Sequence, residues 1–148
     1  MAASNFHATG VVLGTRGLLI TGPSGSGKTA LALALIDAWR AQGQFSRLIA
    51  DDQVLLSVSH GRLIAQTPDA IAGLVEVFGI GPKPVDYIGQ AVIDGLCELV
   101  PAVSAPRFQE DDNEVLHGCH VPKIRLAELS AHTTMPTVLA WIGGIAAR

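Results

Sequence analysis

The sequence predicts an α/β domain in which helices pack on a mixed sheet. Short apolar runs of strand length alternate with a segment rich in alanine and leucine that is typical of a helix. A glycine-rich loop lies between a predicted strand and that helix. The chain has 148 residues, 49% hydrophobic and 16% charged, which is enough to bury a core. We therefore expect a single domain over residues 1–148.

The first half of the domain begins with two predicted strands, residues 11–13 and 18–21, joined by a tight turn. The alanine- and leucine-rich segment 30–40 is predicted to be a buried helix, and Gly43 is a plausible end for it. Residues 47–50 follow as a buried strand that leads into two aspartates.

The middle of the chain predicts more strands. Residues 54–58 and 62–66 flank a short polar turn and indicate a hairpin. Residues 74–78, LVEVF, are typical of a strand, and the glycine- and proline-rich stretch 79–84 is predicted to be a loop.

The last third gives weaker signals. Residues 96–103 fit either a strand or a helix, residues 101–109 are expected to be irregular, and the acidic run 110–114 is expected to be a solvated loop. A closing helix is predicted over 136–147, with Thr134 as its N-cap.

Charge and composition exclude several classes of function. The formal net charge is −3 and no cluster of lysine or arginine is present, so we expect neither nucleic acid nor an anionic membrane as a partner. No apolar run has the length of a membrane span, and residues 1–10 lack the features of a signal peptide. The two cysteines, Cys97 and Cys119, do not form a disulfide framework, which favours the reducing cytoplasm.

The stretch GPSGSGKT, residues 22–29, fits the Walker A pattern G-x-x-x-x-G-K-[ST]. Its glycines permit the backbone conformations of an anion-binding loop, and the following helix presents N–H groups to a phosphate. We expect Lys28 to contact the β- and γ-phosphates of a nucleotide and the Thr29 hydroxyl to contact Mg²⁺. This P-loop predicts nucleotide binding at Gly22, Pro23, Ser24, Gly25, Ser26, Gly27, Lys28 and Thr29.

Asp51 and Asp52 directly follow a predicted strand, at the edge of the sheet where α/β proteins bind ligands. An aspartate there can hold Mg²⁺ or accept a proton from an attacking hydroxyl, and a polar turn that caps the strand is the alternative. Adjacent side chains diverge, so the two cannot share one role. Glu76 lies within an apolar strand and indicates either a paired or metal-bound carboxylate or an exposed edge strand.

The order of these motifs along the chain resembles that in the kinase domain of bacterial HPr kinase/phosphorylase. The resemblance is carried by His7, the P-loop, ADD at 50–52 and GLVEVFGIG at 73–81, and more loosely by APRFQ at 105–109 and VPKIRL at 121–126. The family's separate N-terminal domain has no counterpart in this sequence. The chain therefore resembles the short forms that consist of the kinase domain alone.

The resemblance implies a P-loop domain of the phosphoenolpyruvate-carboxykinase-like type that assembles as a homohexamer. It also implies a protein-serine kinase that uses ATP and Mg²⁺ to phosphorylate HPr, a phosphocarrier of the sugar phosphotransferase system or of its nitrogen-related branch. In the reverse reaction of the family, inorganic phosphate attacks phosphoserine and yields pyrophosphate.

The resemblance also implies roles for single residues. Asp51 matches the catalytic aspartate, which accepts the serine proton and returns it in the reverse reaction. Asp52 is expected to orient the site. His7 is expected near Asp51, as a hydrogen-bond partner of that carboxylate or of the transferring phosphoryl group, although by itself it is also typical of a surface histidine. Glu76 is expected to contact Mg²⁺ beside Thr29.

The chain departs from the family pattern at Phe78, which stands where the family has an arginine. An apolar ring does not stabilise phosphoryl charge as a guanidinium does, which bears on the rate and on the phosphorolysis reaction. Lys83 is a weak candidate for a substitute cation. Arg107 matches an arginine near the protein substrate and could bind phosphate or stabilise the transition state, but it also fits an ordinary surface arginine.

Two other functions stay open. A regulatory nucleotide-binding protein with little catalysis is favoured by Phe78, and a small-molecule kinase is disfavoured because few arginines for a lid follow Gly81.

The HGCH stretch at 117–120 lacks a second Cys/His cluster, so loop and core residues are expected instead of zinc ligands. Trp39 and Trp141 are expected to be core anchors.

Overall fold

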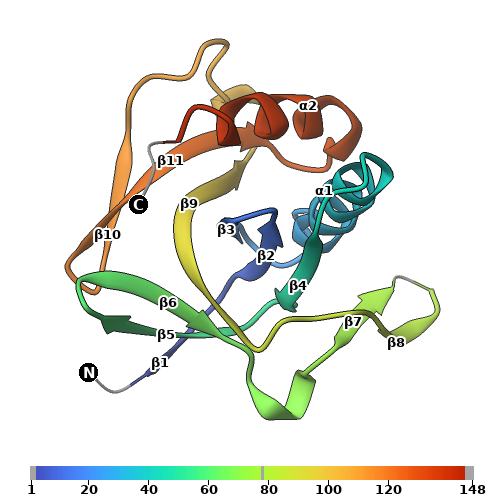
Figure 1. Ribbon diagram of the computed structural model, residues 1–148. Helices are drawn as coiled ribbons and strands as arrows, with labels where there is room; N and C mark the ends of the chain where they lie inside the picture. The colour runs from blue at the N-terminus through green and yellow to red at the C-terminus, as the bar shows by residue number, and fades with distance from the viewer. Residues whose placement is uncertain (1–2, 78, 146–148) are drawn as a thin grey trace.

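The computed structural model describes residues 3–77 and 79–145. Within these residues, nine strands form one mixed sheet, two further strands pair separately, and two helices are present, α1 (Lys28–Ala41) and α2 (Ala131–Ile142). Figure 1 shows the sheet curling around the molecule, with both helices on the same side of it. The predicted α/β class, a mixed sheet with packed helices, is confirmed.

The large sheet has the order β1-β5-β6-β9-β3-β2-β4, with β11 beside β9 and β10 beside β11. Its strands are β1 (Ser4–Phe6), β2 (Thr9–Leu13), β3 (Arg16–Thr21), β4 (Ser46–Ala50), β5 (Val54–Ser59), β6 (Arg62–Gln66), β9 (Gln90–Val100), β10 (Asn113–Leu116) and β11 (Cys119–Ala127). The separate pair consists of β7 (Leu74–Val77) and β8 (Gly81–Pro84). Two short 3-10 helices lie at Asp69–Ile71 and Ala102–Ser104.

Four strands end at the same edge of the sheet. β9 is parallel to both β3 and β11, and β2 is antiparallel to both β3 and β4, so β3, β4, β9 and β11 run in one direction. The segments that follow these strands therefore lie close together. They are the P-loop, the Asp51–Asp52 pair, the stretch after Val100 and the turn before α2.

Apolar residues are buried on both faces of the central strands. Leu18 and Ile20 of β3 pack into the core cluster that contains α1 and α2. Leu19, which points the other way, packs into a second cluster formed with the β1-β5-β6 part of the sheet. Burial on both faces explains why these strands appear in the sequence as uninterrupted apolar runs.

The first half of the predicted fold is largely confirmed. The two first predicted strands are β2 and β3, and the predicted hairpin is β5 and β6. The predicted helix is α1, which begins two residues before the expected position 30. Gly43 lies just beyond its end with φ 73°, a left-handed conformation that favours glycine. Trp39 and Trp141 are partly buried against the helix-side core, as expected.

The loop predicted at 79–84 is wrong for its last four residues, because Gly81–Pro84 forms β8 and pairs with β7. The two prolines of β8 face Leu74 and Glu76 on a pair that has no third strand, where a missing N–H is tolerated. The ambiguous stretch 96–103 is mainly the end of β9, a strand of 11 residues.

The prediction of a closing helix was wrong about where it begins. α2 begins at Ala131 with Ser130 as its N-cap, so Thr134 lies inside the first turns, where its hydroxyl donates to the Ser130 carbonyl at 2.9 Å. Pro136 lies within the helix instead of at its start. The predicted end, residue 147, falls outside the described residues. Of the acidic run 110–114, the last two residues belong to β10.

Neither helix in the described part of the chain is both long and apolar enough to cross a membrane.

Candidate active site

The P-loop presents the start of α1 to a cleft. Gly27, the N-cap of α1, has φ 96°, which a residue with a side chain rarely adopts. No side-chain hydrogen bond caps this helix, and its first turn contains no acidic residue. A Cβ at Gly22 would lie 2.6 Å from Oγ of Ser26, so this glycine is required for the tight fold of the loop. The backbone is therefore suited to an anion at the positive end of the helix dipole.

Lys28 is buried, and its ammonium group bonds to the loop itself. Nζ donates to the carbonyl oxygens of Gly22 at 2.9 Å and Pro23 at 3.1 Å. It also lies 3.4 Å from Oδ1 of Asp52. The ammonium group is thus held between the loop carbonyls and the carboxylate of Asp52.

An open cleft of about 420 Å³ lies over the P-loop. It is lined by residues from four segments, namely Ser24, Gly25, Gly27, Lys28, Thr29, Ala30, Asp51, Asp52, Glu76, Gly79 and Leu129. The P-loop, the two aspartates that follow β4 and Glu76 of β7 therefore share one cavity, as the sequence predicts.

Asp51 is buried, and both of its carboxylate oxygens are engaged. Oδ1 accepts hydrogen bonds from the Thr29 hydroxyl at 2.7 Å and the Thr9 hydroxyl at 3.1 Å. Oδ2 accepts from the backbone N–H of Glu76 at 3.1 Å. Asp51 thus joins the P-loop, β2 and β7, and its oxygens point to protein donors.

Asp52 has different surroundings. Its φ of 66° is a left-handed conformation that aspartate tolerates better than most residues, and its side chain is 54% exposed. Oδ1 lies 2.7 Å from Nε2 of His7. Because a carboxylate only accepts, the imidazole N–H is the donor. The backbone N–H of Asp52 donates to the Thr9 hydroxyl at 3.1 Å.

This geometry differs from the roles expected from the sequence. His7 was expected near Asp51, but it contacts Asp52. Asp51 was expected to exchange a proton with the substrate, but it is buried and bound to three donors, whereas Asp52 lies in the cleft beside Lys28. The left-handed φ of Asp52 turns the two adjacent side chains apart. Both line the cleft, but Asp51 is buried against protein donors and Asp52 is half exposed, and the sequence does not reveal this difference.

Glu76 is exposed and lines the cleft from β7, while its neighbour Val75 is buried. Glu76, Asp51 and Thr29 could together hold a metal ion. Mg²⁺ prefers oxygen ligands and commonly takes one or two carboxylates together with substrate phosphates. The Thr29 hydroxyl and the carboxylates of Asp51 and Glu76 are oxygen donors in the same cleft, so the residues present fit Mg²⁺.

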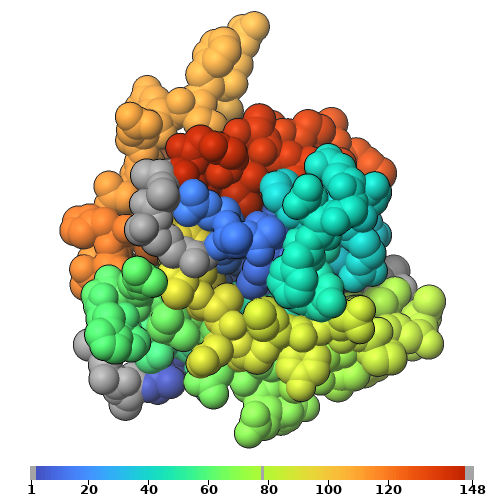
Figure 2. Space-filling model, in the orientation of Figure 1, coloured from blue at the N-terminus to red at the C-terminus, as the bar shows by residue number. Residues whose placement is uncertain are grey.

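Two residues from the sequence analysis lie elsewhere. Arg107 is exposed on the segment after β9, which stands out from the surface in Figure 2. Its guanidinium lies 5.6 Å from the ring centre of Phe108, and it does not line the cleft. Lys83 is exposed on β8 opposite Val75 and does not line the cleft either. Phe78, the departure from the family pattern, falls outside the described residues.

Two residues of the site were missed by the sequence analysis. Thr9 is fully buried and bonds to both aspartates, but a threonine in an apolar strand gives no distinguishing signal. Leu129, in the turn before α2, reaches the P-loop from a distant part of the chain.

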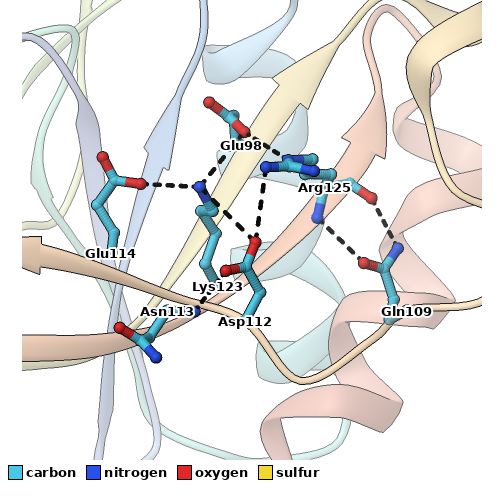
Figure 3. A network of polar contacts seen from close by, with 7 residues as sticks. All are labelled: Glu98, Gln109, Asp112, Asn113, Glu114, Lys123 and Arg125. Carbon is cyan, nitrogen blue, oxygen red and sulfur yellow. Dashed lines mark hydrogen bonds and ion pairs between the residues drawn. The ribbon is translucent and has the colours of Figure 1, made fainter.

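A second polar cluster lies on β9, β10 and β11 and on the segment before β10, and Figure 3 shows Lys123 among the carboxylates of Glu98, Asp112 and Glu114. Lys123 is buried and donates to Glu114 at 2.8 Å, with Glu98 and Asp112 also within 4 Å. The hydrogen bond to Glu114 raises the pKa of Lys123. The cluster's charges are paired with one another, which indicates a structural role.

The HGCH stretch spans a turn and the start of a strand. His117 and Gly118 lie in the turn between β10 and β11, and Cys119 and His120 begin β11. Residues 3–77 and 79–145 contain no group of three or more His, Cys, Asp or Glu side chains that could hold a metal ion.

Comparison with known proteins gives consistent matches. HPr kinase/phosphorylase from Clostridium botulinum (strain Eklund 17B / Type B) is 41% identical over 78 residues, which are 53% of this chain and 24% of that protein. HPr kinase/phosphorylase from Lactobacillus acidophilus is 34% identical over 136 residues, 83% of this chain and 40% of that protein. The chain thus spans well under half of the length of these relatives.

A solved structure matches over nearly the whole chain. The Hpr(Ser) kinase/phosphatase from Coxiella burnetii superposes with a TM-score of 0.80 at 27% identity, covering 95% of this chain and 96% of that one. The model of the HPr Serine kinase C-terminal domain matches residues 1–91, more than half of this chain and including the P-loop, Asp52 and Glu76. The protein therefore belongs to the family of the HPr serine kinase C-terminal domain.

Proposed function

We propose that this chain is a protein-serine kinase domain that transfers the γ-phosphoryl group of ATP, in the presence of Mg²⁺, to a serine of HPr. The observation that carries the proposal is the placement of Asp52, which lies in the P-loop cleft, 2.7 Å from His7 and 3.4 Å from Lys28. A carboxylate, an imidazole and a buried cation at the phosphate end of a P-loop are suited to moving a proton during phosphoryl transfer.

Asp52 is the proposed general base, in place of Asp51. Its carboxylate accepts the proton of the serine hydroxyl as the serine oxygen attacks the γ-phosphorus, and the bond from that phosphorus to ADP breaks. The ring N–H of His7 donates a hydrogen bond to Oδ1 of Asp52 and holds this side chain in place. Lys28 stabilises the negative charge on the phosphoryl oxygens.

Asp51 has a positioning role in this proposal. Its bonds to Thr29, Thr9 and the Glu76 backbone fix the P-loop relative to β2 and β7. When bound, Mg²⁺ supplies neutralisation of the phosphate charge, and Thr29, Glu76 and Asp51 are the residues that would hold it.

The same residues can run the reverse reaction. A protonated Asp52 donates to the serine oxygen while an oxygen of inorganic phosphate attacks the phosphorus of phosphoserine, which leaves serine and pyrophosphate. One carboxylate is sufficient for both directions, because the second is the microscopic reverse of the first.

The proposal is tested by incubating the protein with labelled ATP, Mg²⁺ and HPr from the same cell. We expect serine-linked label on HPr with the wild type. Asp52→Asn is expected to lower the rate at least about 100-fold with nucleotide binding retained, since asparagine keeps the left-handed backbone and removes the base. Asp69→Asn, at an exposed position outside the cleft, is the matched control and should transfer normally. Adding phosphate to labelled HPr should release pyrophosphate.

Two results would contradict the proposal. Unchanged transfer in Asp52→Asn would remove Asp52 from the mechanism and return Asp51 to consideration. Nucleotide binding by the wild type without any transfer to HPr would favour the regulatory alternative. The single-domain boundary, the hexamer and the cytoplasmic location stay predictions.

A further inference from the structure

Leu129 has an unusual position for a large apolar residue. It is 74% exposed and has φ 55°, in the left-handed region. This conformation is rare for a bulky side chain and is energetically unfavourable. A leucine that is both exposed and strained receives little stabilisation from packing against its neighbours in the fold.

Helix capping does not account for Leu129. It precedes Ser130, the N-cap of α2, where an apolar residue often packs against an apolar residue at the fourth helical position. That position is Thr134, whose hydroxyl is bonded to the Ser130 carbonyl. With three quarters of Leu129 exposed, no such packing stabilises the helix start.

Backbone hydrogen bonds fix Leu129 against the P-loop. Its N–H donates to the Ser26 carbonyl at 3.0 Å, and the N–H of the preceding Glu128 donates to the Val100 carbonyl at 2.8 Å. A Cβ built on Gly27 would lie 3.7 Å from Cδ2 of Leu129, so the leucine side chain lies beside this glycine. Leu129 therefore forms an apolar wall of the cleft that also contains Lys28 and Thr29.

The strand order indicates which end of a nucleotide Leu129 faces. β4, which Asp52 follows, lies on one side of β3, and β9 and β11 lie on the other. The P-loop follows β3, so Asp52 and Leu129 approach it from opposite sides. If the terminal phosphate lies beside Asp52 and Lys28, the nucleoside lies toward the β11 side of the loop, where Leu129 and Ala30 line the cleft.

We propose that Leu129 is the contact for the nucleobase of the bound nucleoside triphosphate. This inference rests on the proposed nucleotide binding and adds the residue that recognises the base. An apolar side chain attracts the face of any base but reads no hydrogen-bonding edge. The contact therefore distinguishes a nucleotide from inorganic polyphosphate and distinguishes adenine from guanine poorly.

The test compares the dissociation constants of ATP, GTP and inorganic tripolyphosphate, each with Mg²⁺, by titration calorimetry. Leu129→Gly removes the side chain and keeps the left-handed backbone. We expect it to weaken ATP and GTP by about tenfold each and to leave tripolyphosphate within about twofold. Leu129→Met, which restores an apolar side chain, should bind ATP within about threefold of the wild type.

The matched control is His60→Gly, since His60 has φ 53° in the exposed turn between β5 and β6 and does not line the cleft. It should leave all three dissociation constants unchanged. Circular dichroism of each variant confirms that the fold is retained.

Several outcomes would overturn the inference. If Leu129→Gly binds ATP as tightly as the wild type, Leu129 does not contact the base. If ATP and tripolyphosphate weaken equally, the residue only supports the shape of the loop. If transfer to HPr is lost while ATP binding is intact, it contacts the protein substrate instead. Wild-type protein that binds no nucleotide would overturn the proposed function as well, whereas the first three outcomes leave that function standing.

Discussion

The Thr29 hydroxyl donates a 2.7 Å hydrogen bond to Oδ1 of the buried Asp51 carboxylate. This bond connects the start of α1 to the end of β4, and the other Asp51 oxygen binds the backbone N–H of Glu76 in β7. Three segments that approach the cleft from different directions are therefore held by one side chain.

We predict that Asp51→Asn lowers the free energy of unfolding by about 1–3 kcal/mol, because an amide cannot accept at both positions and leaves a buried donor unsatisfied. Asp52→Asn should change it by less than about 0.5 kcal/mol, since Asp52 is half exposed and asparagine suits its backbone. Urea denaturation of the two variants measures the difference. Equal losses in both would show that Asp51 has no special structural role.

Gly17 is required by close contact between β3 and β9. A Cβ at Gly17 would lie 2.1 Å from the Val92 carbonyl oxygen, which a backbone cannot accommodate without moving. We predict that Gly17→Ala costs about 3 kcal/mol or more of stability. Gly89→Ala is the matched control, since no atom lies within 4 Å of its added Cβ, and it should cost no more than about 0.5 kcal/mol. Thermal melts followed by circular dichroism compare them, and a Gly17→Ala protein as stable as the control would refute the contact.

The two thiols should react differently. Cys97 is completely buried, and burial raises the pKa of its thiol to about 12, so the reactive thiolate is absent at neutral pH. Cys119 is partly exposed. We predict that a thiol reagent modifies Cys119 in the native protein and Cys97 only after denaturation, as mass spectrometry of the labelled peptides can determine. Rapid labelling of Cys97 in the native state would contradict its burial.

The raised pKa of Cys97 also has a consequence for stability. In the unfolded chain the thiol ionises near its ordinary pKa of about 8.5, while the folded protein keeps the proton. The contribution of the protonated Cys97 thiol to the free energy of unfolding is therefore fully present below about pH 8.5. It declines by about 1.4 kcal/mol per pH unit as the pH rises toward 12. In denaturation series at several pH values, the difference between wild type and Cys97→Ala should show this decline.

Lys123 should stabilise the β9-β10-β11 region. Lys123→Met leaves three carboxylates without their buried cation, and we predict a loss of about 1–3 kcal/mol at neutral pH. Because the pKa of Lys123 is raised by its bond to Glu114, its contribution is complete below the ordinary lysine value of about 10.4 and is lost as the pH rises through the raised value. The difference between wild type and Lys123→Met should therefore shrink in strongly alkaline solution.

Arg125→Met is the control for this cluster. Arg125 contacts Glu98 and Asp112 but is half exposed, so its replacement should cost less than about 1 kcal/mol. Equal losses of stability in Lys123→Met and Arg125→Met would indicate that burial of Lys123 has no effect on how much it stabilises the protein.

The sequence predicted the local parts of the fold well. The P-loop, α1 and the strands on either side are specified by glycines, by helix-forming residues and by apolar runs that are close together in the chain. The prediction failed where local signals opposed the tertiary context. Pro82 and Pro84 indicate a loop, yet they are tolerated in β8 because the pair has an open edge. Pro136 is typical of a helix start, yet packing of Val138 and Ile142 against α1 and the sheet lets the helix begin at Ala131.

The site shows the same limit. The motif located the P-loop and the acidic pair, but the identity of the residues cannot distinguish Asp51 from Asp52. That distinction arises from the left-handed backbone at Asp52, from Thr9 in β2 and from His7 in the link between β1 and β2. Leu129 is more than 100 residues from Ser26, and only the parallel alignment of β11 with β9 brings the two together.

Lys28 gives the P-loop a further property. Its ammonium group is already bonded to the carbonyl oxygens of Gly22 and Pro23 and is shielded from water. A polyphosphate that binds must replace these carbonyl acceptors as the partner of the Lys28 ammonium group. The heat released on binding therefore reports the difference between the old and the new contacts of this group, instead of the full strength of the new contacts. A calorimetric enthalpy that is small for so charged a ligand is the expected thermodynamic signature of this exchange.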